Sequence, residues 1–325
     1  METKAETKAK THSSQELRPC TTQELREDVT MLMNMLWQQP PHKQHVPCPC
    51  PRSLMEDNLP RLRKGNFVVG EKTNGTRMFL MLGWNHHQGN YAVLIDRAYH
   101  IVHAPITARN DSLYQGTLVD GEWEPQTCTY TVFDVVASAG RLRKNKRFKD
   151  RYSIYRKLTE QLHGEVRIRA KAWHPLAHTA ALWARMQEQN SDADGLIFQS
   201  QDAKLKPGIQ DGVFKWKPSH TLDLYLHTDA QGQVQVQCGD GPRIADLQQQ
   251  FHVQVDPVRS ANVTLDNDVK VVECELALLE GGKVKATPIL ERTDKVYAND
   301  LKVVRFTVQN VKEHITIDQL STNCS

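Results

Sequence analysis

The 325-residue sequence contains no apolar run long enough to cross a bilayer. Its longest apolar stretches, such as MFLMLGW at residues 78–84, are far shorter than the roughly 20 residues that a membrane helix needs. The polar, lysine-rich residues 1–18 also lack the apolar segment of a signal peptide. Both absences favour a soluble intracellular protein with no membrane association. They predict a flexible tail over residues 1–20 and leave cytoplasm and nucleus equally open.

Neither the cysteines nor the net charge form a pattern that defines a function. The seven cysteines are scattered, and Cys48 and Cys50 have no matching pair at zinc-binding spacing. Reduced thiols in an intracellular protein are therefore expected. The net charge of +3 barely constrains the partners. Residues 140–152 hold seven Lys and Arg, and this run is either a solvated loop or a surface that follows a phosphate backbone.

The order of the periodic segments predicts a mixed sheet with helices, followed by a second domain. Residues 21–39 combine a threonine three residues before a glutamate with apolar residues at helical spacing, which predicts a capped amphipathic helix. The proline-rich residues 38–54 exclude a helix or a central strand. Residues 66–136 are mostly strand-like, and helices and further strands follow. Beyond Pro218 the strands are short and alternating, which is typical of a small barrel or sandwich.

The stretch VVGEKTNGTRMFLML, residues 68–82, has apolar flanks around Asn74-Gly75. Asn-Gly between two apolar runs predicts a two-residue hairpin turn, in which Lys72 would face Arg77. Two cations placed opposite one another repel. The register therefore predicts either a solvated pair or an anion between the two cations.

Other polar groups flank predicted strands. Lys215 and Lys217 lie two residues apart in FKWKP, so both point to one face of a strand. The acids of VDGEW and SDADGLIF precede or follow apolar strands, and Arg292 and Lys295 lie beyond the last strands of the second domain. Each group taken alone fits a solvated turn or edge strand, so only their ordered combination is specific.

That combination resembles the covalent nucleotidyltransferases, the superfamily of messenger-RNA capping guanylyltransferases and polynucleotide ligases. EKTNGTR resembles the first motif of the superfamily, with Lys72 as the nucleophile. VDGEW, YTVFDVV, DGLIF, FKWKP and RTDKVYAND resemble the later motifs, in family order between residues 71 and 300. The RTDK ending with Asn299 has the capping form rather than the ligase form. The likeness is closest to the small stand-alone capping enzymes of large DNA viruses.

The resemblance implies an α+β fold in two domains. Residues 21–220 would form a nucleotidyltransferase domain of the ligase and capping type, with mixed and antiparallel sheets. Residues 310–325 would pack back on it. Residues 221–309 would form an oligonucleotide-binding (OB-fold) β-barrel. The chain leaves no room for a triphosphatase or a methyltransferase, so the resemblance implies that separate proteins supply these activities.

The same resemblance implies the chemistry. Lys72 would attack the α-phosphorus of GTP, expel pyrophosphate and pass GMP to the 5′-diphosphate end of RNA. Lys215, Lys217 and Arg77 would disfavour the charged form of Lys72 and release its lone pair. Mg²⁺ or Mn²⁺ would neutralise phosphate charge in both steps. Asn74 stands where the family usually has Asp. Asparagine keeps an acceptor oxygen but removes a charge, and this charge bears on the rate of Lys72 guanylylation.

The remaining roles transfer by matched motif. Glu122 and Asp194 would hold the metal, and Asp194 would also lie near the Lys72 amine. Phe133 would stack on the guanine, and Lys171 would donate to the guanine O6. Arg77 and Glu122 are expected at the ribose hydroxyls. The β and γ phosphates would be contacted by Arg97 and, after closure of the second domain, by Arg292 and Lys295.

Two rival functions stay open. An ATP-dependent polynucleotide ligase would share Lys72 and the metal, but the RTDK ending and the chain size argue against it. A cap-binding module would have kept the fold and lost catalysis. The presence of Lys72 together with its motif partners argues against this second rival.

Overall fold

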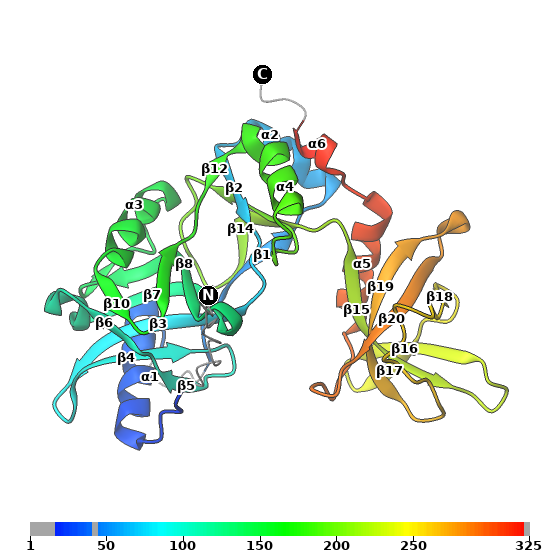
Figure 1. Ribbon diagram of the computed structural model, residues 1–325, viewed down its shortest axis with the longest axis horizontal. Coiled ribbons are helices and arrows are strands. Elements are labelled where there is room, and N and C mark those ends of the chain that lie inside the picture. Colours follow the sequence, from blue (N-terminus) through cyan, green and yellow to red (C-terminus); the bar gives the residue numbers. More distant parts are fainter. Residues whose placement is uncertain (1–16, 41–44, 322–325) are drawn as a thin grey trace, which may run out of the picture. The chain divides into compact units, whose positions relative to one another are not determined.

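The computed structural model describes residues 17–40 and 45–321 (Figure 1). The expected tail, residues 1–20, lies mostly outside the described residues, as do residues 322–325 of the expected C-terminal segment. The chain divides into two compact units. The first contains the residues up to Arg52, Gly65–Leu176 and Met186–Phe214, and the second contains Ser53–Lys64, Ala177–Arg185 and the residues from Lys215 onwards. The domain boundaries expected from the sequence stay a prediction.

The larger sheet of the first unit has seven strands. Its order is β11-β8-β7-β3-β4-β5, with β9 beside β8. Figure 1 labels β8, β7, β3, β4 and β5 of this sheet. Neighbouring strands are antiparallel except β11 and β8, which run parallel. The strands are β3 (Thr76–Asn85), β4 (Gly89–Ile95), β5 (Ile101–His103), β7 (Thr117–Glu124), β8 (Thr129–Ser138), β9 (Arg141–Leu142) and β11 (Arg167–Ala170).

Helices cover both faces of this sheet, which explains why the apolar run in β3 is continuous rather than alternating. Phe79 and Met81 of β3 belong to the buried cluster that includes α1 (Gln23–Trp37). Leu80 and Leu82 point the other way, into the cluster that includes α3 (Phe148–Thr159). The expected helix is present as α1, but its capping box of Thr21 and Glu24 is wrong, because the N-cap is Thr22, which makes no side-chain cap hydrogen bond.

A second sheet carries the end of the strand that leads to Lys72. Its order is β1-β14-β13-β2-β12. The proline-rich β1 is an edge strand, as the missing backbone donors require. The strands are β1 (Pro49–Ser53), β2 (Phe67–Glu71), β12 (His174–Pro175), β13 (Leu196–Ser200) and β14 (Gly208–Trp216). A separate antiparallel pair joins β6 (Ile106–Ala108) to β10 (Leu162–Gly164).

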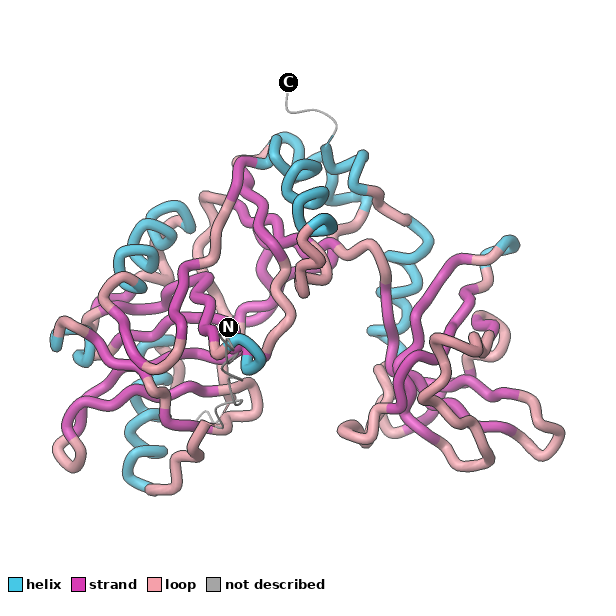
Figure 2. The backbone as a smooth tube through the Cα atoms, viewed as in Figure 1, coloured by secondary structure: helices cyan, strands magenta, loops and turns pink. Residues whose placement is uncertain are grey.

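The second unit is built on a six-stranded sheet of order β17-β16-β15-β19-β20-β18 (Figure 1). Figure 2 draws its strands in magenta. Its buried cluster takes Val304 and Val311 from α5 (Leu301–Glu313), which packs on the sheet. The strands are β15 (His220–Thr228), β16 (Val234–Asp240), β17 (Arg243–Asp246), β18 (Phe251–Val253), β19 (Lys270–Leu278) and β20 (Val284–Glu291). The remaining α-helices are α2 (Leu59–Lys64), α4 (Thr179–Glu188) and α6 (Ile317–Ser321).

The mixed α+β architecture is confirmed, and the short strands beyond Pro218 are present. The sequence interpretation missed β17 and α5. The signal for α5 was available, because Asp300 precedes apolar residues at helical spacing and its side chain caps the Lys302 N–H at 2.9 Å. Within the described ranges, no helix is long and apolar enough to span a membrane.

Candidate active site around Lys72

The chain around Asn74-Gly75 does not form a hairpin, so the turn prediction is wrong. The flanking strands lie in different sheets: β2 pairs with β13 and β12, whereas β3 pairs with β4 and β7. The Lys72 N–H donates to the Gly195 carbonyl at 2.8 Å, so the chain stays beside β13 as far as Lys72 before it crosses to the other sheet. In β7 it is Glu122, not Lys72, that lies opposite Arg77.

Gly75 is required for a close approach to β7. A Cβ at this position would lie 2.6 Å from the Trp123 carbonyl oxygen and 2.9 Å from Glu122 Cγ. The Gly75 N–H donates to Glu122 Oε1 at 3.0 Å, and the Thr73 hydroxyl donates to the other carboxylate oxygen. Glu122 therefore holds the loop 73–75, which directly follows Lys72.

The Lys72 amine is paired with a carboxylate. Its Nζ lies 2.6 Å from Asp194 Oδ1, and the two side chains are 22% and 34% exposed. The Asp194 N–H also donates to the Lys72 carbonyl at 3.1 Å. Backbone and side-chain bonds thus fix Asp194 beside Lys72, and the amine remains reachable from solvent.

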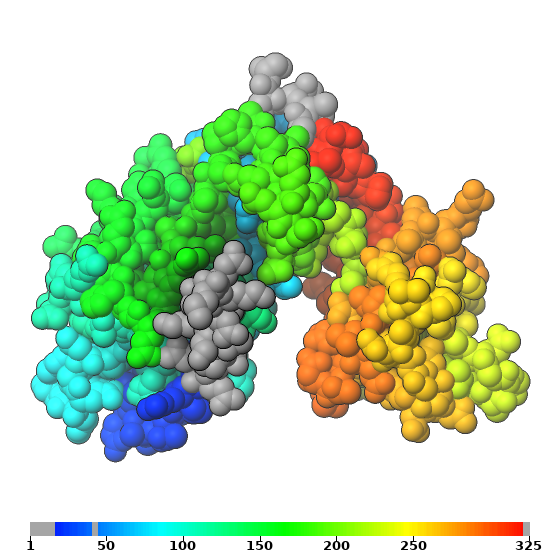
Figure 3. Space-filling view, viewed as in Figure 1, coloured from blue at the N-terminus to red at the C-terminus, as the bar shows by residue number. Residues whose placement is uncertain are grey.

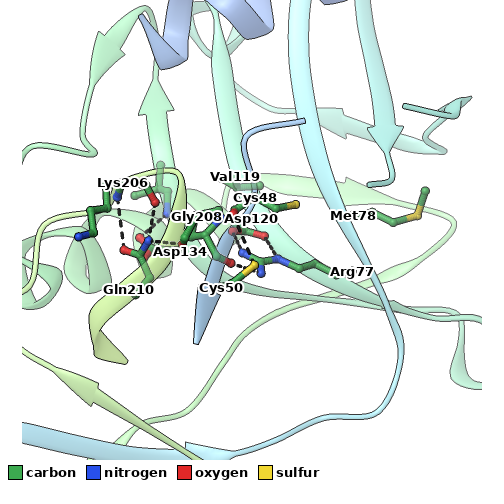
Figure 4. Close-up of polar contacts among 12 residues, drawn as sticks. Cys48, Cys50, Arg77, Met78, Val119, Asp120, Asp134, Lys206, Gly208 and Gln210 are labelled. Atoms are coloured by element: carbon green, nitrogen blue, oxygen red, sulfur yellow. Dashed lines mark hydrogen bonds and ion pairs between the residues drawn. The ribbon is translucent and has the colours of Figure 1, made fainter. Parts of the chain in front are cut away.

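Arg77 has a different carboxylate partner. Its Nε donates to Asp120 Oδ1 at 2.9 Å, its Nη2 bonds the second carboxylate oxygen, and its Nη1 donates to the Pro49 carbonyl. Figure 4 shows this pair with Cys48 and Cys50 beside it. Burial lowers the pKa of Arg77, but the adjacent Asp120 raises it above the ordinary value overall. The two cations that were expected to share one anion therefore each have their own carboxylate.

Phe133 and Lys171 lie together next to these groups. The ring of Phe133 is half-buried, with the Arg77 guanidinium carbon 5.2 Å and the Lys171 Nζ 5.8 Å from its centroid. Burial lowers the pKa of Lys171 to about 8, while Glu122 raises it and Lys72 lowers it. Lys171 therefore belongs to the same electrostatic environment as Lys72 and Glu122.

Trp173 was not singled out from the sequence, although it follows Lys171 by two residues. Lys171 Nζ lies 5.2 Å from its ring centroid, and the Trp173 Nε1–H donates to the Tyr155 hydroxyl at 2.7 Å. Gly70 of β2 makes room for this arrangement. A Cβ there would lie 3.1 Å from Trp173 Cε3 and 3.2 Å from Lys171 Cε.

Arg97 lies close to the Arg77–Asp120 pair. It is exposed just beyond β4, and its charge is one of the smaller causes that lower the pKa of Asp120, whose pKa burial raises overall. Lys215 and Lys217 are half-buried at the end of β14 and belong to the second unit. Together with burial, which is the larger cause, they lower the pKa of His220 to about 4.

Arg292 and Lys295 also belong to the second unit and are held there by carboxylates. Arg292 Nη1 lies 3.1 Å from Asp223 Oδ1, and its Nε and Nη2 each lie 2.9 Å from an oxygen of Asp294. Lys295 bonds the second oxygen of Asp223. Asp223 was not predicted from the sequence, and it is 6% exposed.

Lys72 directly precedes a clamped loop and has a carboxylate beside its amine, and a half-buried aromatic ring lies next to a second, buried lysine. These groups define a candidate nucleotidyltransferase site. The chain belongs to the mRNA capping enzyme family, because the family model for the mRNA capping enzyme catalytic domain matches residues 14–219. The resemblance inferred from the motifs is thereby confirmed.

Two fungal proteins are similar to this chain, both described as mRNA-capping enzyme subunit alpha. The Neurospora crassa protein is 26% identical over 209 residues, which cover 54% of this chain and 52% of the relative. The Schizosaccharomyces pombe protein is 23% identical over 320 residues, which cover 83% of this chain and 77% of the relative. The match thus spans about half the length of the Neurospora relative.

Among solved structures, the ligase domain of M. tuberculosis LigD is similar at a TM-score of 0.39 and 13% identity, over 76% of this chain and 94% of that domain.

Proposed function

We propose that this protein is a messenger-RNA guanylyltransferase that forms a covalent Lys72–GMP adduct from GTP and transfers the GMP to 5′-diphosphate RNA. The observation that carries the proposal is the Lys72 amine, which lies 2.6 Å from the Asp194 carboxylate and directly precedes the loop that Glu122 clamps. Membership of the capping family supports this choice of reaction.

In the first step the Lys72 nitrogen forms a bond to the α-phosphorus and the bond to pyrophosphate breaks. The amine must first lose a proton, and Asp194 is placed to accept it. In the second step a terminal phosphate oxygen of the RNA attacks the phosphorus of the adduct. The N–P bond breaks, and the Lys72 nitrogen takes back a proton.

Recognition of guanine is assigned to Phe133 and Lys171. An aromatic face suits stacking on a base, and the Lys171 Nζ lies 5.8 Å from the centre of the Phe133 ring. A base stacked there would lie near a donor suited to O6. For the ribose we propose Arg77 and Glu122, and for the β and γ phosphates we propose Arg97, Arg292 and Lys295. Lys215 and Lys217 would stabilise charge on the phosphate oxygens.

Glu122 and Asp194 fit a divalent ion such as Mg²⁺ or Mn²⁺. Along residues 17–40 and 45–321 no group of three or more His, Cys, Asp or Glu forms a complete cation site. Mg²⁺ usually binds one or two carboxylates together with waters and substrate phosphates, so two partly exposed carboxylates beside Lys72 suit it. Such an ion supplies neutralisation of phosphate charge.

Several finer assignments also belong to the proposal. The six-stranded unit would be an OB-fold barrel, the domains would divide as 21–220 and 221–309, and residues 310–325 would pack on the first domain. Separate triphosphatase and methyltransferase proteins would complete the cap, and the likeness to viral enzymes would extend over both domains.

The test is incubation with α-labelled GTP and Mg²⁺, followed by denaturing electrophoresis. We expect acid-labile label on the protein from GTP and none from ATP. Lys72→Arg keeps the charge but removes the usable nucleophile, so it should take up no label. The same substitution at the exposed Lys302 is the matched control.

Label on Lys72→Arg would show that the site is wrong. Label from ATP instead of GTP would favour the ligase. Cap binding without any label would favour the non-catalytic module.

A further inference from the structure

A cleft of about 300 Å³ lies beside the start of α3 in the first unit. Its wall includes the aromatic residues Phe148, Tyr152 and Trp173. Phe148 stacks on Tyr152 with ring centroids 6.1 Å apart and meets Trp173 edge-on at 5.3 Å. Tyr152 and Trp173 are only half-buried. The cleft therefore presents a fixed aromatic surface that is partly open to solvent.

The basic run 140–152 divides into structural and exposed cations. Arg151 is buried against Asp134 with an Nε–Oδ1 distance of 2.7 Å. Lys144 is also buried, with its Nζ donating to the Trp37 carbonyl at 2.6 Å. Three further cations of the run are exposed and lie at or just before the first turn of α3, namely Lys146, Arg147 and Lys149.

Arg147 is paired with Asp150 of the first turn, with an Nε–Oδ2 distance of 3.4 Å. Helix stability does not explain Lys149, because positive charge in the first turn of a helix opposes the helix dipole and costs a few tenths of a kcal/mol. Lys149 lines the cleft. Arg156, one helical turn beyond Tyr152, is exposed and holds its guanidinium carbon 5.7 Å from the Tyr152 ring centroid. Cations thus flank the aromatic surface, and α3 lies on the exterior of its unit in the space-filling view (Figure 3).

The cleft is adjacent to the proposed guanine site. Trp173 lines the cleft, and its ring also lies 5.2 Å from the Lys171 Nζ. Val68 lines the cleft four residues before Lys72 in the chain, a span of about 13 Å at about 3.3 Å for each strand residue. An RNA chain whose 5′ end is at Lys72 can reach this distance with its first nucleotides.

We propose, on the basis of the proposed function, that this cleft is a subsite for the single-stranded acceptor RNA. An unpaired base close to the 5′ end stacks on Tyr152 and meets Trp173 edge-on, because Phe148 is parallel to Tyr152 and nearly perpendicular to Trp173. Lys146, Lys149 and Arg156 contact the phosphates. Aromatic stacking flanked by cations binds single strands with little sequence preference, because every base has a π-face. Paired bases in a duplex cannot enter such a cleft. The subsite therefore selects an unpaired 5′ end.

The test uses the double variant Lys146→Glu/Lys149→Glu in the full-length chain. Binding of a fluorescent 5′-diphosphate single-stranded 20-mer is measured against salt concentration. The binding constant falls as salt rises, with a slope of about −0.7 in log K against log salt for each phosphate contact on a single strand. Loss of two contacts should make this slope shallower by about 1.4. Tyr152→Ala should weaken binding by about tenfold or more at every salt concentration through lost stacking.

The matched control is Arg109→Glu/Lys157→Glu, which makes the same change of charge at exposed positions. Arg109 lies near the far end of α3, where its N–H donates to the Gln161 carbonyl. Lys157 lies about 12 Å from Lys149 at about 1.5 Å for each helical residue. The control should keep the salt slope of the parent.

Three outcomes separate the two proposals. Equal RNA binding by Lys146→Glu/Lys149→Glu and the parent overturns the subsite, whatever GTP labelling shows. An RNA duplex that binds as tightly as the single strand also overturns it. A parent chain that takes up no label from GTP, yet loses RNA binding in the double variant, overturns the guanylyltransferase and supports the RNA subsite.

Discussion

Lys171→Met should stabilise the protein and impair its choice of nucleotide. Lys171 is 8% exposed. The difference between its ordinary pKa of 10.5 and the value of about 8 that burial imposes, at about 1.36 kcal/mol for each pKa unit, corresponds to about 3 kcal/mol. The ring centroids of Phe133 and Trp173 lie 5.8 and 5.2 Å from its Nζ. Each cation–π interaction offsets about 1 kcal/mol of this penalty. Methionine keeps the length and removes the charge, so we expect a gain in unfolding free energy of about 1–2 kcal/mol at neutral pH.

The gain should depend on pH in a defined direction. Below about pH 8 both the folded and the unfolded chain hold the Lys171 proton, so the penalty is present in full. Between about 8 and 10.5 the folded protein has released the proton and the unfolded chain still holds it. The stability of the parent therefore rises with pH across this window, and the advantage of Lys171→Met should shrink.

Urea unfolding of both proteins, at neutral pH and near pH 10, measures this difference. Lys204→Met at an exposed position is the control and should change stability by less than about 0.5 kcal/mol. Lys171→Met should also lose preference for GTP over ATP in Lys72 labelling, because O6 would lose its donor. A destabilised Lys171→Met at neutral pH, or a gain that does not shrink near pH 10, would refute the reasoning.

The remaining predictions concern the loop, the buried pair and the second unit. Gly75→Ala should reduce labelling of Lys72 by about tenfold or more while costing about 1–3 kcal/mol of stability, measured by labelling and urea unfolding, because its Cβ cannot fit against β7. Asp120→Asn should cost about 3–5 kcal/mol in urea unfolding, since it leaves Arg77 unpaired, and Asp120→Leu/Arg77→Met should recover most of that loss. Arg292→Ala should lose most labelling from GTP, while the small amount of Lys72–GMP adduct that it forms should pass GMP to diphosphate RNA at near-parent rate. Equal damage to both half-reactions would contradict the assignment of Arg292 to the leaving pyrophosphate.

The strand pattern was predictable because the apolar periodicity is local. The hairpin was not, although Asn-Gly is among the strongest local turn signals. The partner of β2 is β13, whose residues follow more than a hundred positions later, as the pairing of Glu71 with Leu196 shows. A glycine at position 75 suits either a hairpin turn or a close approach to β7. Only its position against the Trp123 carbonyl shows that the close approach is the reason. Long-range pairing therefore overrode the local preference.

The motifs identified the family, but they could not show which charges pair. Arg77 and Asp120 are not opposite one another in the ladder, where Arg77 faces Glu122 and Phe79 faces Asp120. Their bond depends on a guanidinium that reaches diagonally between neighbouring strands. Sequence spacing predicts only the strands. Whether Arg77 pairs with Glu122 or with Asp120 depends on the side-chain geometry.

Arg77 and Lys72 differ in how easily a phosphate could replace the carboxylate that each one bonds. The Asp120 side chain is 0% exposed and that of Arg77 15%, so exchanging this partner would leave a buried carboxylate without compensation. Arg77 is thus a fixed part of the scaffold. It still has two unassigned donors among its five N–H groups, which suffices for the proposed ribose contact.

Lys72 is in the opposite situation. Its partner Asp194 is 34% exposed, so water or a divalent ion can compensate the carboxylate when the amine turns to the α-phosphorus. An exposed ion pair contributes about 1 kcal/mol or less, which a triphosphate can replace. In the proposed reaction, the carboxylate that holds the resting amine would also receive its proton. The partly exposed Lys72–Asp194 pair is therefore open to exchange with a substrate phosphate, whereas the buried Arg77–Asp120 pair is a rigid frame beside it.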